Sequence, residues 1–399
     1  MDKVRIRYPV ISRELEAWLV EIRRDFHRHP ELGFQEKRTS RKIAEILTRL
    51  GLEVRTGVGG TGVVGLLRGK HPGKTVALRA DIDALPMTEQ NDVAYRSQNP
   101  GVMHACGHDA HAAIMLGAAR IISESGFART GRGNVKFFFQ PAEELLGGAR
   151  AMIADGAMEN PSVDIVLATH VTPALPTGTL GFFEGITHSS SDRIEIFLTG
   201  RGGHAASPHL CVDPILAGAH LLTQLHSVVS RSVDPQGMAV LSIGVFEGGT
   251  AHNIIPDQTV IKGTVRALDE NIRRTVKKRI HQIVRGIKQS ADLKEARLDY
   301  HELCPPCPQD PRIRGFMKAA AEKMLGSKNV RDLKPSNGSE DFAFFAQRAP
   351  SCMFRLGAGG GKSGNRVFHS ATFDIDESAL KIGAAFISRA VLEYLAQQP

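Results

Sequence analysis

Short apolar runs alternate with segments of helical periodicity along the first 188 residues, and this alternation limits the fold more than any other feature. The helical spacing of apolar residues predicts amphipathic helices over 12–27, 39–50, 109–123 and 143–154. Runs short enough to be strands occupy 61–68, 75–80, 135–139 and 163–168, and the last two are apolar enough to be read as buried strands. Strands that alternate with helices predict an α/β domain with a mostly parallel sheet.

The pattern changes after about residue 188. Strands are expected at 193–198, 238–245, 259–265 and 297–301, with helices over 213–229 and 269–289. The order β-α-β-β-α-β is that of a ferredoxin-like unit. Helices near 312–325 and 377–395 then resume the first pattern. The predicted fold class is therefore α/β, with a mixed, mostly parallel sheet between helices built from 1–188 and 300–399 and an inserted ferredoxin-like α+β domain over 189–299.

Composition excludes several classes of protein. An apolar fraction of 42% and a charged fraction of 23% are typical of globular domains rather than disordered chains. No apolar run is long enough to span a bilayer, and the N-terminus lacks the apolar core of a secretory signal, so we expect no membrane association. Five scattered cysteines do not make a disulfide scaffold, which favours a cytoplasmic location. The net charge of +8 leaves nucleic-acid binding open, but the basic residues are dispersed and aromatics are only 6%.

The segment His104–His111, with the sequence HACGHDAH, carries the strongest chemical signal in the chain. Cysteine and histidine are preferred ligands of Zn²⁺ and similar divalent metals. In an extended segment alternate residues share a face, so Cys106 and His108 can point into one site. Two alternatives stay open: a polar cluster at a helix start with Asp109 as its cap, and a thiol hydrolase that uses Cys106 as nucleophile.

Paired carboxylates follow the buried strand at 135–139. Glu143 and Glu144 follow Pro141 and Ala142 and are expected in the first turn of the next helix. Acidic residues there can simply compensate the helix dipole. Two adjacent glutamates at the carboxyl end of an α/β strand, where sites collect, instead indicate function. Because adjacent side chains diverge, we expect one glutamate to bind metal and the other to transfer protons.

Further ligand types lie beside other element ends. Asp81 and Asp83 follow the strand at 75–80, His170 follows the strand at 163–168, and His369 is distant in sequence. Each alone would more often be structural. Together with the two preceding motifs they suggest a two-metal site, whose ions can polarise a carbonyl and activate water. That chemistry is hydrolytic.

At these residues the chain resembles the aminoacylase and hippurate hydrolase family, which includes plant hydrolases of auxin–amino-acid conjugates and, more distantly, carboxypeptidase G. The resemblance covers nearly the whole chain. The matching segments are 26–32, 79–86, 104–111, 140–144, 202–205, 252–256, 338–342 and 368–370.

The resemblance implies a metal-dependent amidohydrolase that cleaves N-acyl amino acids, of the hippurate type, to a carboxylate and a free amino acid. It implies two divalent ions, Mn²⁺ or Zn²⁺, held by Cys106, His108, Glu144, His170 and His369. Glu143 would be the general base and Asp81 would orient a ligand. His204, from the inserted domain acting as a lid, would stabilise the oxyanion, in several relatives across a dimer; Asn253 and Arg266 are weaker candidates for the substrate carboxylate.

The resemblance also implies a homodimer or homotetramer formed through the lid domain. A carboxypeptidase or dipeptidase remains an alternative, since a peptide bond differs little from an acyl amide. From other classes, a metal-free Cys106 hydrolase and a nucleic-acid module with a structural zinc also stay open. A structural zinc site has no use for a free base such as Glu143, which argues against the last.

Overall fold

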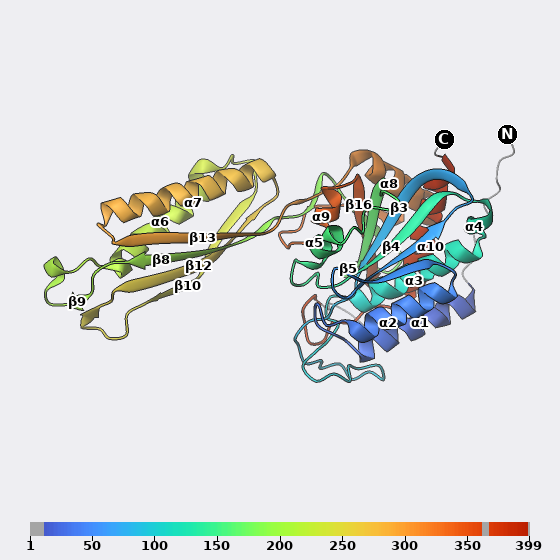
Figure 1. The fold of residues 1–399 in the computed structure, drawn as a ribbon, viewed down its shortest axis with the longest axis horizontal. Coiled ribbons are helices and arrows are strands. Elements are labelled where there is room, and N and C mark those ends of the chain that lie inside the picture. The colour runs from blue at the N-terminus through green and yellow to red at the C-terminus, as the bar shows by residue number, and fades with distance from the viewer. Residues whose placement is uncertain (1–11, 361–366, 398–399) are drawn as a thin grey trace. The chain divides into compact units, whose positions relative to one another are not determined.

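A computed structural model describes residues 12–360 and 367–397, which form two compact units (Figure 1). One unit comprises the chain up to Gly185, Pro308–Lys334 and the chain from Phe344 onward; the other comprises Ile186–Cys307 and Pro335–Ala343. The sequence placed the corresponding boundaries at 188/189 and 299/300. The short return of 335–343 into the second unit was not anticipated, because that segment has no periodic pattern.

The first unit is built on an eight-stranded mixed sheet in the order β1-β2-β4-β3-β5-β16-β6-β15. Four of the seven neighbouring pairs are parallel, namely β3/β4, β3/β5, β5/β16 and β6/β15. The strands are β1 (Glu53–Val58), β2 (Gly62–Arg68), β3 (His71–Asp81), β4 (Arg132–Gln140), β5 (Ile165–Pro176), β6 (Leu180–Phe183), β15 (Val330–Leu333) and β16 (Ser351–Gly359). The predicted mixed, mostly parallel sheet is confirmed.

Helices lie on both faces of this sheet (Figure 1). Phe137 and Phe139 of β4 belong to the main apolar core, whereas Phe138 points to the opposite face and stacks on Phe345 with ring centroids 5.3 Å apart. This follows from the two-residue period of a strand. The helices of the unit are α1 (Arg13–Arg28), α2 (Lys37–Arg49), α3 (His108–Glu124), α4 (Phe127–Thr130), α5 (Gly148–Ala154), α8 (Pro311–Leu325), α9 (Ala343–Ala346) and α10 (Ser378–Gln397).

Two expected elements differ in extent from those observed. The helix expected from Glu143 begins only at Gly148, because Ala142 and Leu146 have φ of 50° and 54° and the residues between them form a tight turn. Strand β5 continues past Ala168 to Pro176, since β16 pairs with it along that length, so His170 lies within a strand rather than after one.

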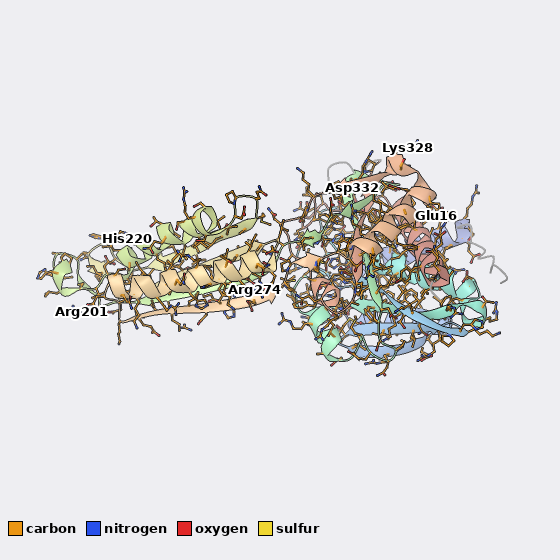
Figure 2. All side chains as sticks on the ribbon, turned by 90° about the horizontal axis from the view of Figure 1, so that it is seen from above. Glu16, Arg201, His220, Arg274, Lys328 and Asp332 are labelled. Atoms are coloured by element: carbon orange, nitrogen blue, oxygen red, sulfur yellow. The ribbon has the colours of Figure 1, made fainter. Side chains whose placement is uncertain are left out.

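The second unit contains a four-stranded antiparallel sheet in the order β10-β12-β8-β13, with α6 and α7 packed together on it (Figure 1). This order is the ferredoxin-like arrangement predicted from the sequence. Asp213 and Asp269 cap α6 and α7, and His220 and Arg274 lie on their exposed faces (Figure 2). The elements are β7 (Ile186–His188), β8 (Ser191–Thr199), β9 (Gly203–His204), α6 (Pro214–Ser232), β10 (Ala239–Gly248), β11 (Ile254–Ile255), β12 (Gln258–Ala267), α7 (Glu270–Ser290), β13 (Glu295–Cys304) and β14 (Cys307–Pro308).

Within the described residues, no helix combines the length and apolar character that crossing a bilayer requires.

Candidate metal centre

The first unit brings together five side chains that the sequence singled out as ligands. They form two clusters in which all candidate ligand atoms lie within 4.8 Å of one another: Cys106, His108 and His170, and Cys106, Glu144 and His369. Cys106 Sγ is 3.6 Å from His170 Nε2, and His369 Nε2 is 3.3 Å from Glu144 Oε1. Cys106 belongs to both clusters, so its sulfur lies near all four of the other candidate ligands.

Cys106 and His108 are held at the start of α3 by a glycine between them. Gly107 is the N-cap residue of α3 and has φ of 90°. A Cβ added there would lie 2.5 Å from Val171 Cγ2, so both the backbone conformation and the space require glycine. Val171 follows His170 in β5. The missing side chain of Gly107 therefore allows the start of α3 to lie close to the strand that carries His170.

Glu143 and Glu144 lie in the turn between β4 and α5. Glu36 accepts a hydrogen bond from the Ala142 backbone N–H at 2.8 Å, and Asp83 Oδ2 accepts one from the Glu144 N–H at 3.0 Å. Buried carboxylates therefore fix the turn on both sides of Glu143. Glu143 itself is 7% exposed, and its carboxylate forms a third close group with His108 and Glu144.

The two remaining histidines are anchored by backbone contacts. His170 Nδ1 is 2.7 Å from the Val171 carbonyl oxygen, which leaves Nε2 facing Cys106. His369 has φ of 58°, and its N–H donates to the Ala105 carbonyl at 2.9 Å. The second contact ties the His369 segment directly to the segment that carries Cys106.

Asp81 contacts the centre through its neighbours. Arg79 Nη1 donates to Asp81 Oδ2 at 2.7 Å, and His111 Nδ1 lies 2.5 Å from Asp81 Oδ1. His111 Nε2 accepts the Val171 N–H at 2.9 Å. Asp81 Oδ2 is 3.8 Å from His108 Nε2, beyond hydrogen-bond distance.

The chemistry of the donor set fits a pair of divalent ions. His108 Nε2 is fully buried and has no hydrogen-bond partner among the described residues, although Asp81 and Glu144 oxygens lie 3.8 and 4.0 Å away. A buried polar atom without a partner is costly, and a metal ion would satisfy it. Thiolate, imidazole and carboxylate donors suit zinc and related transition metals.

Burial and charge set the protonation of the two outer histidines. Burial, with a smaller effect of Arg355, holds the pKa of His170 well below its usual range, so its ring is neutral, as metal ligation requires. Hydrogen bonds to Cys106 and Glu144 raise the pKa of His369 to about 10. Cys106 and Glu144, which contact His369 here, are also the side chains with which it would bind an ion.

The other three residues that the sequence singled out lie in the second unit. His204 and Asn253 are exposed and close together, because β9 pairs with β11 and the Ala205 N–H donates to the Asn253 carbonyl at 3.1 Å. Arg266 lies near the far end of β12, where it is half-buried and donates to Ser339 Oγ. Burial lowers the pKa of Arg266.

Supporting residues were harder to find from the sequence than ligands. The sequence marks Asp83 only as a carboxylate at a strand end, yet its side chain contacts both the His108 ring and the Glu144 backbone. His111 was seen within the His104–His111 segment but without a partner. The sequence signal for Asp83 is its position two residues after Asp81, and the signal for His111 is its position three residues after His108. Neither spacing shows which side chains meet across the edge of a sheet.

Comparisons with known proteins identify the family of the chain. The model of the peptidase family M20/M25/M40 matches residues 77–393. The chain is 37% identical to a hippurate hydrolase of Campylobacter jejuni, covering 96% of this chain and 98% of that one, and 39% identical to thermostable carboxypeptidase 1 of Saccharolobus solfataricus, covering 93% and 94%. The solved YXEP protein of Bacillus subtilis, described as a dinuclear metal binding peptidase, is 31% identical with a TM-score of 0.83, covering 96% and 99%.

The family model spans most of the chain, and the relatives are matched over nearly their whole length. The two ligand clusters are compatible with a metal-dependent hydrolase. The fold predicted from the sequence, and the prediction of a metal-dependent amide hydrolase, are confirmed. The chain belongs to the peptidase M20/M25/M40 family.

Proposed function

We propose that this enzyme hydrolyses N-acyl amino acids to a carboxylate and a free amino acid, with two divalent ions, Mn²⁺ or Zn²⁺, held by Cys106, His108, Glu144, His170 and His369. The observation that carries the proposal is the pair of three-ligand clusters that share Cys106, with the buried Glu143 carboxylate beside them. A structural metal site has no use for a proton-transferring base, so the Glu143 carboxylate beside these clusters supports a catalytic centre.

Within this proposal Glu143 transfers the protons. Bound metal ions would polarise the scissile carbonyl and make water acidic enough to lose a proton near neutral pH. Glu143 takes that proton and later delivers it to the nitrogen of the leaving amine. Its place in a turn fixed by Glu36 and Asp83 keeps the carboxylate aimed in one direction during both transfers.

His204 is proposed to donate to the oxyanion that develops on the acyl carbon. Its Nδ1 accepts the Ala206 N–H at 3.0 Å, which leaves a protonated Nε2 pointing outward as a donor. Asn253, its neighbour across β9 and β11, is proposed to bind substrate beside it.

Arg266 is proposed to bind the substrate carboxylate, and its position bears on the oligomer. It lies nine residues after Asp257, which contacts Gly202 near His204. Nine residues of strand span roughly 30 Å, more than the length of an N-acyl amino acid. If His204 and Arg266 act on one substrate molecule, they therefore come from different chains. This supports a homodimer, or a tetramer built from dimers, formed through the second unit.

Two exposed apolar side chains flank the ligands and favour an apolar acyl group. Leu145, 63% exposed, follows Glu144, and Val367, 65% exposed, precedes His369 by two residues. The relatives include an N-acetyl-L-cysteine deacetylase of Bacillus subtilis besides the hippurate hydrolase. The carboxypeptidase relative keeps a second candidate, release of amino acids from short peptides. A reducing compartment such as the cytoplasm suits Cys106, which binds metal only as a free thiolate.

A panel of substrates tests the proposal. Hippurate-type, fatty-acyl and acetyl amino acids would be compared with dipeptides by the release of free amino acid from the metal-loaded enzyme. Faster turnover of N-acyl amino acids is expected. A consistent preference for dipeptides would support the carboxypeptidase alternative, and no turnover of any amide would overturn the proposal.

A further inference from the structure

Asp83 is the residue that joins the two ligand clusters from behind. Its Oδ1 lies 3.2 Å from His108 Nδ1, and its own backbone oxygen lies 3.0 Å from the same nitrogen. Its Oδ2 accepts the Glu144 N–H at 3.0 Å. One oxygen of Asp83 therefore contacts His108, a member of the first cluster, and the other contacts the backbone of Glu144, a member of the second.

The backbone around Asp83 is rigidly held. The N–H of Ile82 donates to the Gln140 carbonyl at 2.9 Å, and the N–H of Ala84 donates to the Glu31 carbonyl at 2.8 Å. The Asp83 side chain is fully buried. A buried carboxylate on a pinned backbone can hold its partners to within a few tenths of an ångström, which ligand geometry requires.

Asp83 and Asp81 act on different parts of the centre. Asp81 is bound by Arg79 and His111, and through His111 it reaches the backbone beside His170, a ligand of the first cluster only. Asp83 contacts His108 of the first cluster and the Glu144 backbone of the second.

We propose that Asp83 is a positioning residue that sets the geometry of both metal sites at once, by fixing His108 with Nε2 toward the ion and by fixing the Glu144 turn. This inference rests on the proposed function, because it presumes that the two clusters hold metal. Outer partners of this kind are worth about 10–100-fold in metal affinity. An asparagine at this position has one acceptor oxygen for two N–H donors, so repulsion between its amide nitrogen and one donor turns the side chain and weakens both contacts.

Titration of the metal-stripped full chain with Co²⁺ tests the proposal. The absorption of the thiolate–cobalt band reports on Cys106, and competition with a chelator gives the affinity of each site. Asp83→Asn is expected to weaken both sites by about tenfold or more and to shift the cobalt band at saturation. Asp81→Asn is expected to weaken the first site alone.

The matched control is Asp164→Asn. Asp164 accepts the Thr75 N–H at 2.8 Å, six residues before Asp81 in β3, so this change removes a similar hydrogen bond away from the metal centre. Parental affinity of Asp83→Asn at both sites, or a loss at only one site, would overturn the inference. If the parent chain itself takes up no cobalt, the proposed function fails rather than this inference.

Should Asp83→Asn fail to fold, nitrogen NMR of the parent chain loaded with Zn²⁺ decides. A proton on His108 Nδ1 that exchanges slowly with water is expected. An Nδ1 without a proton would contradict the contact with Asp83.

Discussion

Glu143 and Glu144 are adjacent, but their surroundings give them different chemistry. The Glu144 carboxylate lies 3.3 Å from His369 Nε2 and its N–H is bound by Asp83, so this residue is built into a ligand cluster. The Glu143 carboxylate faces His108 and Glu144 without belonging to either of the clusters that contain Cys106. This division is the physical basis for giving one glutamate to metal and the other to protons.

Glu143→Gln should therefore separate binding from chemistry. The amide has nearly the same size but cannot take a proton, so we expect kcat to fall by about 10²–10⁴-fold. The metal content, measured by elemental analysis, should stay at the parental value. Glu144→Gln is the matched comparison and should lose metal. Full activity of Glu143→Gln would remove it from the proton-transfer role.

Lys136 is a buried cation that the proposed reaction does not use. Its Nζ donates to the carbonyl oxygens of Ala157 and Glu159 at 3.0 and 2.5 Å. Burial, with a smaller effect of Arg55, lowers its pKa from 10.5 to about 8. Between these values the folded state holds fewer protons than the unfolded state, so the free energy of unfolding rises with pH.

Urea unfolding at pH 7.5 and pH 10.5 measures this contribution. The parent chain should gain up to about 3 kcal/mol over this range relative to Lys136→Met, which has no charge to titrate. An identical pH dependence in both proteins would show that Lys136 titrates normally in the folded state.

The elements that carry the ligands were predicted unequally well. The start of α3 was placed within one residue, because Asp109 and the apolar period mark a helix start. The sequence pattern predicts helix at the Glu143 turn, and this is wrong because the positive φ of Ala142 and Leu146 leaves no signal in the composition. The length of β5 depends on pairing with β16, nearly 200 residues later, and no local pattern contains that pairing. The His108 partner Asp83 was hidden for the same reason.

Within the second unit, a buried ion pair ties α7 to the sheet. Asp192 of β8 accepts from Arg273 Nε at 3.0 Å and from the Tyr300 hydroxyl at 2.7 Å. Arg273→Met leaves the buried Asp192 charge without its cation and should lower the free energy of unfolding by about 3 kcal/mol. Arg274→Met is the control, since Arg274 lies on the exposed face of α7 (Figure 2) and should change stability by less than about 0.5 kcal/mol.

Hydrogen exchange locates this effect. Faster exchange in Arg273→Met should be confined to β8, α7 and β13. Equal free energies of unfolding for Arg273→Met and Arg274→Met would mean that the attraction between Asp192 and Arg273 only offsets the cost of removing their charges from water.

The proposed dimer predicts that His204 of one chain serves the site of the other. Two variants that are inactive alone test this when their chains are allowed to exchange: His204→Ala and Glu143→Gln. If His204 acts across a dimer, each mixed dimer regains one complete site. Random exchange should then restore about a quarter of the parental activity. Mixed dimers that form, as shown by a tag on one chain, but stay inactive would place His204 and Glu143 of one chain in the same site.

The most direct test of the two-metal account is the metal dependence of amide cleavage. Chelator-stripped enzyme would be assayed for release of glycine from hippurate, before and after addition of Mn²⁺ or Zn²⁺, with the number of bound ions measured in parallel. The account predicts no activity in the stripped enzyme and recovery that is complete at two ions per chain. Activity that persists without metal would contradict it and would point to Cys106 as a nucleophile.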